Sequence, residues 1–548
     1  MRNAGTVQMT RTVDIHAPHA FSVDLHVLAG DGAGDGDGDV STIGLTIGLI
    51  RNGDRWRGSV AAADGDLYWL VADGAGPLLD PSADDVVFST AGPRCVFRTG
   101  WPSRQQGAPL SGPPVVYELH VRGFGRTFGG VAERLDDLVD LGVNVIELMP
   151  VHPFETSANY WGYMPVVWGA VHRGYAQGTD AAGELADLVA AAHERGMHVW
   201  LDVVFNHTGE GEAELPTLCL RGLDDTNAYR HHADGSYVND SACGNDIDPA
   251  DPEVRRLMIE ALERYADLGI DGFRFDLASL LTRDGGGLAA LITEWAERRG
   301  VVLIAEAWDM GSYQVGDAFP ERSWAQWNDR FRDDVRGFLR AEPGLVPAMV
   351  QRVQGSPDLF GAQPSRSVNF VTAHDGLTMH DLTAVTSDRH RSWDCGPQLR
   401  LQQLKNFFTV LLVSAGTPMF VMGDEFGRTQ HCHDNPYNID DELTWVDWSR
   451  RDEWRDLRAY VQQLLRLRTA LDESSVRCYG VNGAPDTSHE SRSLAWCSGD
   501  LYVMVNAWWE PLRFVVQEPG EWQFVVASAP ADGLTLAPRS SMVLRRTL

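Results

Sequence analysis

Three acidic residues each follow a strongly apolar, strand-like run in the middle of the sequence. Asp276 ends GFRFD, Glu306 ends LIAE and Asp375 ends TAHD. A carboxylate at a strand end often only caps the next helix or pairs with an arginine, so each residue alone has a structural explanation. Carboxyl groups that meet in one place can instead supply a nucleophile and a proton donor. The three would act together only if the fold brings the ends of their strands to one place.

Arg274 lies two residues before Asp276. On a strand the two side chains would point to one face, while Phe273 and Phe275 would point to the other. The guanidinium could hold Asp276 ionised and oriented, although a purely structural ion pair would have the same pattern.

Two histidines accompany carboxylates at similar positions. His207 follows Asp202 in LDVVFNH, and His374 directly precedes Asp375. Both imidazoles could donate hydrogen bonds to hydroxyl groups of a substrate. A catalytic transition metal is disfavoured because no HxxxH or HxH pair occurs and no thiolate accompanies these residues.

Aromatic residues gather in NYWGYMPVVW, where Tyr163 is the strongest candidate for a ligand contact. Tyr160, Trp161 and Trp168 could stack on apolar ligand faces or pack in the core.

From about residue 115, apolar runs alternate with helical periods, which is typical of βα units and a parallel sheet. Seven strands are clear, and an eighth is expected within residues 325–338; the seven are VVYELHV, VNVIELMP, HVWLDVV, DGFRFDLA, VVLIAEAW, SVNFVTAHD and GTPMFVMGDEF. Eight strands would close a (β/α)₈ TIM barrel, whose functional groups gather at the carboxyl ends of the strands. A doubly wound open sheet is the alternative.

The intervening helices show buried stripes and end signals. One helix should begin with Asp251 as cap and Pro252 in its first turn, and should stop near Gly269. Two apolar stripes are expected, one of Leu185, Leu188, Val189 and Ala192 and one of Leu135, Leu138 and Val139.

Short alternating runs flank the barrel region on both sides. The sequence thus predicts an α/β chain with an N-terminal β-sandwich at 1–106, a catalytic barrel at 107–475 and a C-terminal β-sandwich at 476–548. Within the first, Asp31–Asp39 reads DGAGDGDGD but lacks the spacing of an EF-hand, so a solvated loop is expected.

Composition limits the partners and the location. The net charge of −30 disfavours nucleic acid and anionic membranes, and a neutral sugar fits better. The seven scattered cysteines lack CxxC spacing, which argues against a disulfide framework or zinc site. No signal-like or membrane-spanning apolar run is present, so a cytoplasmic protein is expected.

Four motifs, DVVFNH, GFRFDLAS, AEAW and TAHD, occur in the order and at the spacings of the α-amylase superfamily of glycoside hydrolases, which this chain resembles. SACGNDID, SYQVGDAFP, WNDRFRDDVR, GDEFGRTQHCHDNPYNIDDELTWVDW and LYVMVNAWWEP are similar to the isoamylase and glycogen-debranching subgroup. The resemblance covers almost the whole chain. It implies an N-terminal module like a glycogen-binding domain, a barrel and a C-terminal sandwich.

The resemblance also implies roles for the candidate residues. Asp276 matches the nucleophile, Glu306 the general acid/base and Asp375 the transition-state stabiliser. The residues expected around the sugar at the cleaved bond are Tyr163, Asp202, His207, Arg274 and His374. No cofactor is required by this chemistry; calcium is possible in the family, but no ligand set stands out.

The expected activity is retaining hydrolysis of α-1,6 branch linkages in glycogen-like α-glucans or branched maltooligosaccharides. Only the short segment HPFETSA lies between the second strand and NYWGY, where the debranching relatives are longer. An α-1,4-acting amylase or an α-glucan transglycosylase therefore stays open, because barrel loops set specificity. A non-catalytic glucan-binding protein is disfavoured because all three carboxylates are present. The oligomeric state is not indicated.

Overall fold

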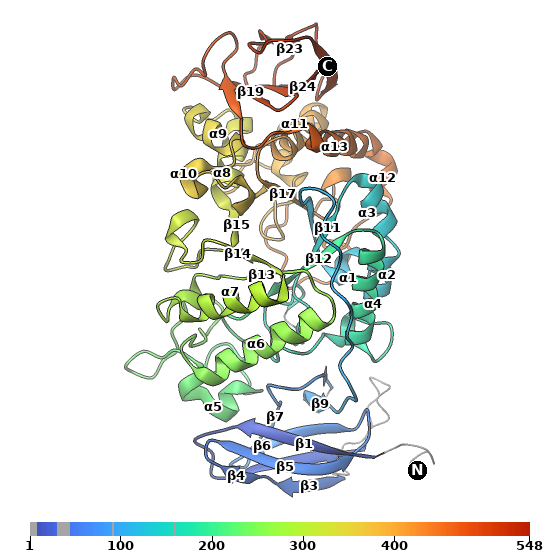
Figure 1. Ribbon diagram of the computed structural model, residues 1–548, viewed down its shortest axis with the longest axis vertical. Coiled ribbons are helices and arrows are strands. Elements are labelled where there is room, and N and C mark those ends of the chain that lie inside the picture. Colours follow the sequence, from blue (N-terminus) through green and yellow to red (C-terminus); the bar gives the residue numbers. More distant parts are fainter. Residues whose placement is uncertain (1–7, 30–43, 90–91, 158, 548) are drawn as a thin grey trace.

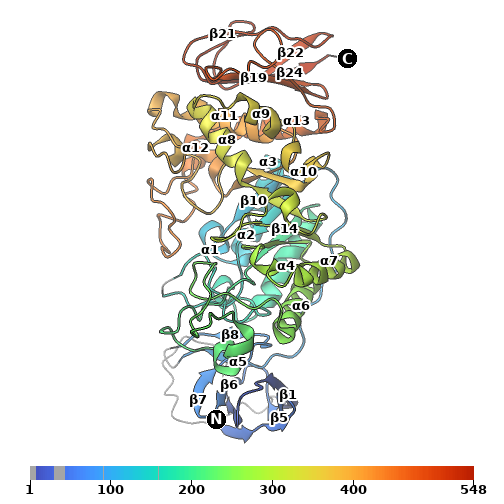
Figure 2. The same ribbon diagram turned by 90° about the vertical axis from the view of Figure 1, so that its left-hand side faces the viewer.

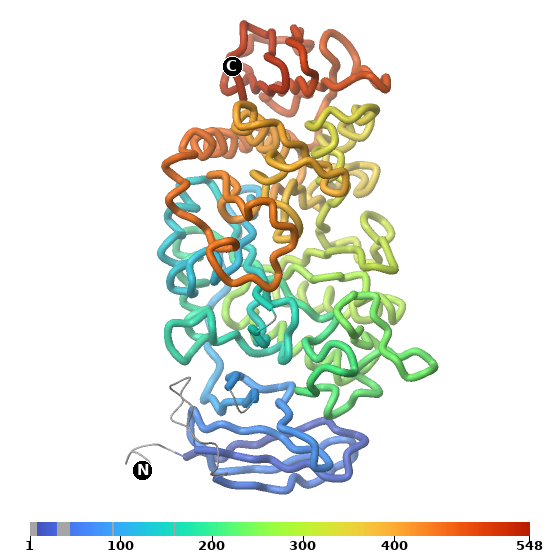
Figure 3. Tube along the Cα trace, turned by 180° about the vertical axis from the view of Figure 1, so that it is seen from behind, coloured from blue at the N-terminus to red at the C-terminus, as the bar shows by residue number. Residues whose placement is uncertain are grey.

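The computed structural model describes residues 8–29, 44–89, 92–157 and 159–547. Three parts follow one another along the long axis of the molecule (Figure 1). N-terminal sheets occupy one end, the barrel lies in the middle and C-terminal sheets occupy the other end. Views from the side and from behind show the same order (Figures 2 and 3).

The middle of the chain forms a closed barrel of eight parallel strands, which confirms the predicted TIM barrel and excludes the open sheet. The strands are β10 (Val116–Leu119), β11 (Val145–Leu148), β12 (His198–Val203), β13 (Gly272–Phe275), β14 (Val302–Ala305), β15 (Ala325–Asn328), β16 (Ser367–Phe370) and β17 (Thr417–Val421). Nearly all their residues are buried because side chains fill the interior and helices cover the outside. The eighth strand, β15, lies within the predicted range.

Helices surround the barrel, the longer ones being α3 (Leu135–Leu141), α4 (Ala181–Glu194), α5 (Leu220–Ala228), α6 (Pro252–Asp267), α7 (Gly287–Arg299), α8 (Asp329–Arg340), α9 (Val346–Val353), α11 (Pro397–Leu412) and α13 (Arg455–Leu467). Helix α6 starts as predicted, with the Asp251 carboxylate accepting the N–H of Val254 at 2.8 Å.

The predicted stripe of α4 is buried, but that of α3 is partly wrong. Val139 is 42% exposed, while Leu135, Leu138 and Leu141 are buried. Residues three apart lie on one face of a helix, whereas Val139 is rotated away from Leu138 by one residue. The buried stripe of α3 therefore contains Leu141 in place of Val139.

The N-terminal part contains two antiparallel sheets. One has the order β1 (Met9–His16), β5 (Arg55–Ala62) and β4 (Ile50–Asn52); the other contains β2 (Val23–Leu28), β3 (Leu45–Gly48), β6 (Leu67–Ala72), β7 (Ala75–Leu78), β8 (Val86–Val87) and β9 (Arg94–Val96). Their inward side chains, such as Ile15, Leu25 and Leu70, form one core. The loop predicted at Asp31–Asp39 lies outside the described residues.

The C-terminal part is a five-stranded antiparallel sheet with a two-stranded sheet beside it. The strands are β18 (Arg477–Tyr479), β19 (Ser493–Ser498), β20 (Leu501–Asn506), β21 (Leu512–Arg513), β22 (Trp522–Ala527), β23 (Thr535–Leu536) and β24 (Ser540–Arg546). Of the alternating run RFVVQ, only Arg513 belongs to a strand. The exact domain boundaries at residues 106 and 475 stay predictions.

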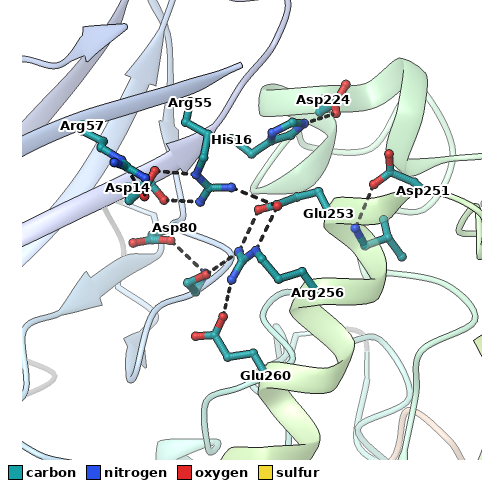
Figure 4. A network of polar contacts seen from close by, with 12 residues as sticks. Asp14, His16, Arg55, Arg57, Asp80, Asp224, Asp251, Glu253, Arg256 and Glu260 are labelled. Atoms are coloured by element: carbon teal, nitrogen blue, oxygen red, sulfur yellow. Dashed lines mark hydrogen bonds and ion pairs between the residues drawn. The ribbon is translucent and has the colours of Figure 1, made fainter. Parts of the chain in front are cut away.

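A polar network joins the N-terminal sheets to the start of α6 (Figure 4). Arg55 donates to Asp14 at 2.6 Å and to Glu253 at 3.0 Å. His16 lies 3.1 Å from the buried carboxylate of Asp224. The N-terminal part is thus fixed to the barrel by ion pairs that are partly shielded from water.

All seven cysteines are free thiols. Within the described part of the chain, no helix combines the length and apolar character needed to cross a lipid bilayer.

Candidate active site

Neighbouring strands bring four of the predicted residues to one end of the barrel. Asp202 of β12 is the register partner of Arg274 of β13. Asp276 directly follows β13, with its N–H bonded to Val203 at 3.1 Å, and Glu306 directly follows β14, with its N–H bonded to Phe275 at 3.1 Å. Parallel pairing thus continues past the strand ends and positions both acids.

Arg274 is the centre of this group. Its side chain has no exposed surface, and its guanidinium lies 4.1 Å from the ring of Trp327. Nη1 donates to Asp202 at 2.7 Å and to Asp276 at 3.1 Å, and Nη2 donates to Glu306 at 2.8 Å. One buried cation therefore links three carboxyl groups.

As predicted from the strand period, the neighbouring phenylalanines point the other way. Phe273 packs against Trp295 with ring centroids 5.7 Å apart, and Phe275 packs against Trp324 at 4.8 Å. These apolar contacts hold β13 against the helical layer and leave Arg274 and Asp276 facing the interior.

Asp276 has a second donor that the sequence analysis did not single out. Nδ2 of Asn206 lies 2.8 Å from Oδ2 of Asp276 and 2.7 Å from its main-chain oxygen. With Arg274 on Oδ1, both carboxylate oxygens accept hydrogen bonds, which orients the group. Asp276 is 8% exposed.

Glu306 is held by backbone as well as by Arg274. The N–H of Leu277, a residue with a left-handed φ of 41°, donates to Oε2 at 3.0 Å. Burial, opposed by Arg274 and assisted by Asp276 and Asp375, raises the pKa of Glu306 to about 8. A carboxyl group with this pKa is protonated in neutral water, as a proton donor must be.

Asp202 is also buried, and its burial raises its pKa to about 6. Its Oδ2 accepts from Arg274 and from the hydroxyl of Tyr163. The ring of Tyr163 stacks on His374 with centroids 4.7 Å apart. Tyr163, Asp202 and His374 therefore form one wall beside Arg274.

His374 and Asp375 follow β16, but their exposures differ. Nδ1 of His374 is 2.7 Å from Oε1 of Glu118, and Nε2 is 3.8 Å from Oδ1 of Asp375. Burial lowers the pKa of His374, but Asp375 and Glu118 raise it more, to about 9. The Asp375 side chain is 58% exposed, so the third carboxylate lies on the open rim.

His207 has both ring nitrogens in contact with protein oxygens. Nε2 is 2.6 Å from the carbonyl oxygen of Tyr163, and Nδ1 contacts Oδ1 of Asn206. Burial lowers its pKa, but nearby Cys243 and Asp276 raise it to about 9. A sugar hydroxyl bound here would share the imidazole with these partners.

Of the four aromatic residues, Tyr160 and Trp168 belong to the core, each 4% exposed. Trp168 packs on Phe205 with centroids 5.6 Å apart. Trp161 instead lies with its edge against His374 at 5.0 Å, next to Tyr163 at the site.

One side chain of the site, Asn206, and two buried acids beside it, Glu118 and Glu147, were not predicted. Asn206 was passed over although it directly precedes His207, and Glu118 and Glu147 each interrupt an apolar strand run, in VVYELHV and VNVIELMP. The two glutamates could have been identified from the sequence, because a charged residue is unusual inside a strand that is otherwise buried on both faces. Among the described residues, no group of three or more His, Cys, Asp or Glu side chains could hold a metal ion.

Comparison with known proteins gives one family match and several similar chains. Residues 113–216 match the model of the α-amylase catalytic domain. The glycogen debranching enzyme of Cronobacter sakazakii is 34% identical over 501 residues, which cover 77% of this chain and 74% of that protein. The glycogen operon protein GlgX homolog of Mycobacterium tuberculosis is 36% identical over 458 residues, with 72% of this chain covered. The match spans only 63% of the mycobacterial protein.

Solved structures show a similar fold. A pullulanase from Anoxybacillus sp. LM18-11, crystallised with maltotetraose, has a TM-score of 0.82 and 23% sequence identity. The match covers all of this chain and 88% of that structure. At this identity the likeness supports the architecture of a barrel with flanking β domains.

Proposed function

Because the chain belongs to the isoamylase and glycogen-debranching group of the α-amylase family, we propose that it hydrolyses α-1,6 branch linkages of glycogen-like glucans or branched maltooligosaccharides with retention of configuration. The observation that carries the proposal is the buried Arg274, which binds both the Asp276 carboxylate, held by one further donor from Asn206, and the Glu306 carboxyl group of raised pKa. These are the properties that a nucleophile and a proton donor need.

The first step is attack by Asp276 on the anomeric carbon. Arg274 and Asn206 fix the two carboxylate oxygens, so the nucleophile is held in one orientation. Glu306 gives its proton to the glycosidic oxygen as the bond breaks, and the leaving chain departs with that proton. The product is a glycosyl ester on Asp276 and an ionised Glu306.

In the second step Glu306 acts as a base. It removes a proton from water, and the oxygen of that water attacks the anomeric carbon and releases Asp276 as a carboxylate. Two inversions give net retention. This mechanism requires a separation of roughly 5–5.5 Å between the two carboxyl groups.

Asp375 and His374 lie where the sugar hydroxyls would be held. Hydrogen bonds to these hydroxyls strengthen as the ring flattens towards an oxocarbenium ion, which stabilises the transition state more than the bound substrate. Tyr163 offers an aromatic face beside them. Asp202 acts indirectly, since its Oδ2 accepts hydrogen bonds from Arg274 and Tyr163.

The proposed preference for α-1,6 linkages is supported by the similarity to debranching enzymes. The cleft is expected to differ from the clefts of those relatives at the short segment before Asn159. We further propose that the reaction needs no cofactor, since carboxyl groups handle the developing charge. A cytoplasmic location is proposed with it.

Substrate specificity is tested by incubating the protein with pullulan, glycogen, amylose and short branched maltooligosaccharides and separating the products by chain length. Release of linear chains from branched substrates, lost in Asp276→Ala, is the expected result. Cleavage of amylose alone would overturn the α-1,6 assignment. Longer products formed with added acceptor sugars would indicate a transglycosylase.

A further inference from the structure

Two buried carboxyl groups lie beside the site without a role in the mechanism above. Glu118 of β10 and Glu147 of β11 are register partners in the parallel ladder, and each side chain is 1% exposed. Burying a charged carboxylate is unfavourable unless it is paired. The partners of the two groups therefore decide what each can do.

Their surroundings differ sharply. Oε1 of Glu118 lies 2.7 Å from Nδ1 of His374, whereas neither oxygen of Glu147 has a hydrogen-bond partner among the described residues. Burial raises the pKa of Glu147 well above its ordinary value, and Glu118 and Asp202 raise it further. Glu147 is thus the neutral acid of the pair, and Glu118 is the one with a cationic partner.

The atoms around Nδ1 of His374 determine where its proton lies. Besides Glu118, the Oη atom of Tyr163 lies 3.3 Å from Nδ1. Tyr163 donates its own hydrogen to Asp202, so its oxygen can only accept at Nδ1. Both neighbours of Nδ1 are therefore acceptors, and Nδ1 carries a proton.

The other ring nitrogen is directed differently. Nε2 lies 3.8 Å from Oδ1 of Asp375, whose side chain is largely exposed at the rim. The ring plane is fixed by stacking on Tyr163 and by Trp161 at 5.0 Å with an interplanar angle of 84°. Packing thus sets the plane of the imidazole. The contact with Glu118 determines which edge of the ring carries Nδ1 and leaves Nε2 on the side of Asp375.

We propose that Glu118 is a positioning residue of the reaction, which binds the Nδ1 proton of His374 and so keeps the imidazole charged, with Nε2 directed to Asp375 and the bound sugar. The inference rests on the proposed function, because the sugar is what Nε2 would contact. A charged donor binds a hydroxyl more strongly than a neutral one, so the charged imidazole would hold the sugar in position for attack by Asp276.

Several charged groups face His374 and affect its pKa, so each bears on the test of the proposal. Glu118 comes from β10, Asp375 follows β16, and Arg274 comes from β13; the two acids raise the pKa of the imidazole and the arginine lowers it. Removing the charge of Glu118 leaves Arg274 in place, so the pKa of His374 should fall.

The direct test is Glu118→Gln, which preserves an acceptor for Nδ1 but removes the charge. The ratio kcat/KM should fall about 10- to 100-fold, mostly through kcat. The basic limb, which Glu306 sets near pH 8 in the wild type, should become steeper, because His374 then loses its proton at a lower pH than its wild-type value of about 9. The matched control is Glu147→Gln on the neighbouring strand, which should keep wild-type kcat and pH profile because Glu147 is already neutral.

A double-mutant cycle separates positioning from general damage. In a His374→Asn background, Glu118→Gln should cost little further activity, because the residue through which it acts is gone. Full additivity of the two losses, or an unchanged basic limb in Glu118→Gln, would overturn the proposal.

A readout that needs no substrate is the ¹⁵N NMR titration of the histidine side chains, with the His374 signals identified from His374→Asn. In the wild type, His374 should be an imidazolium at pH 7.5, and in Glu118→Gln it should titrate at lower pH. A neutral His374 in the wild type would refute the inference even if Glu118→Gln does not fold. A protein inactive on every glucan would instead refute the proposed function, while the titration still decides the role of Glu118.

Discussion

Nη2 of Arg274 lies 2.8 Å from Oε2 of Glu306, so a permanent cation contacts the group proposed as proton donor. Alone, this contact would favour the ionised form of Glu306. Burial acts in the opposite direction and raises the pKa to about 8, with help from Asp276. The site thus orients its acid with a cation and still leaves the proton in place.

The pH dependence of the reaction should show this raised pKa. Glu306 loses its proton as pH rises through about 8, so kcat/KM should fall on the basic side and decline about tenfold per unit above pH 8. Initial rates between pH 5 and 10 on a branched maltooligosaccharide would measure the limb. A basic limb near pH 5 would contradict the assignment.

Substitution of the nucleophile and substitution of the acid should reduce activity on different sets of substrates. Asp276→Asn should lose about 10⁴-fold or more in kcat on every substrate, because no glycosyl ester can form. Glu306→Gln should lose a similar factor on glucans but retain far more activity on an α-maltosyl fluoride, since fluoride leaves without a proton. Equal losses of Glu306→Gln on both substrates would argue against its role as acid.

Asp375→Asn should reduce turnover rather than affinity. The amide keeps the shape of the side chain but loses the charge that strengthens hydrogen bonds in the transition state, so kcat should fall about 10²- to 10³-fold with a nearly constant KM. Steady-state kinetics on a short branched substrate separate the two parameters. A raised KM with unchanged kcat would assign Asp375 to ground-state binding.

Arg274→Lys should destabilise the folded protein and also abolish its activity. A lysine cannot reach three carboxyl groups in a planar fork, so buried carboxylates would be left without a partner. The free energy of unfolding in urea should fall by about 3–5 kcal/mol. Arg57→Lys is the control: its side chain is 55% exposed and pairs with Asp14, so a loss within about 1 kcal/mol is expected.

His16 should stabilise the junction with the N-terminal sheets in a pH-dependent manner. Its hydrogen bond to Asp224 raises the pKa of His16 above 6.5. The stabilisation is therefore fully present below the pKa of the unfolded chain and is lost as pH rises through the higher folded value.

Calorimetry should accordingly show a larger drop in Tm for His16→Ala at pH 6 than at pH 9. His19→Ala is the matched control, because His19 approaches the same Asp224 at 3.8 Å but is 64% exposed. Equal drops for His16→Ala at the two pH values would show that only packing is lost.

The barrel strands and the carboxylates could be predicted because each strand ends in a short motif whose residue types reflect the chemistry. Arg274 and Asp276 share a face through the two-residue period of the strand, and the structure keeps them together. The pairing of His374 with Glu118 could not be predicted, because 256 residues separate them and only closure of the barrel brings β10 and β16 to one interior. Val139 was misassigned because a seven-residue helix gives too little periodicity to fix its face.

The network in Figure 4 contacts the first turn of α6 through Glu253. The chain then continues from α6 into β13 and on to Asp276. The N-terminal module therefore cannot be exchanged for another without changing its contacts with the barrel. A version of the barrel without it, or with a foreign module, would present Asp224 and Glu253 to solvent without His16 and Arg55. Recombination between relatives would have to move this pair of surfaces together, so the module and the barrel are expected to have been inherited as one unit.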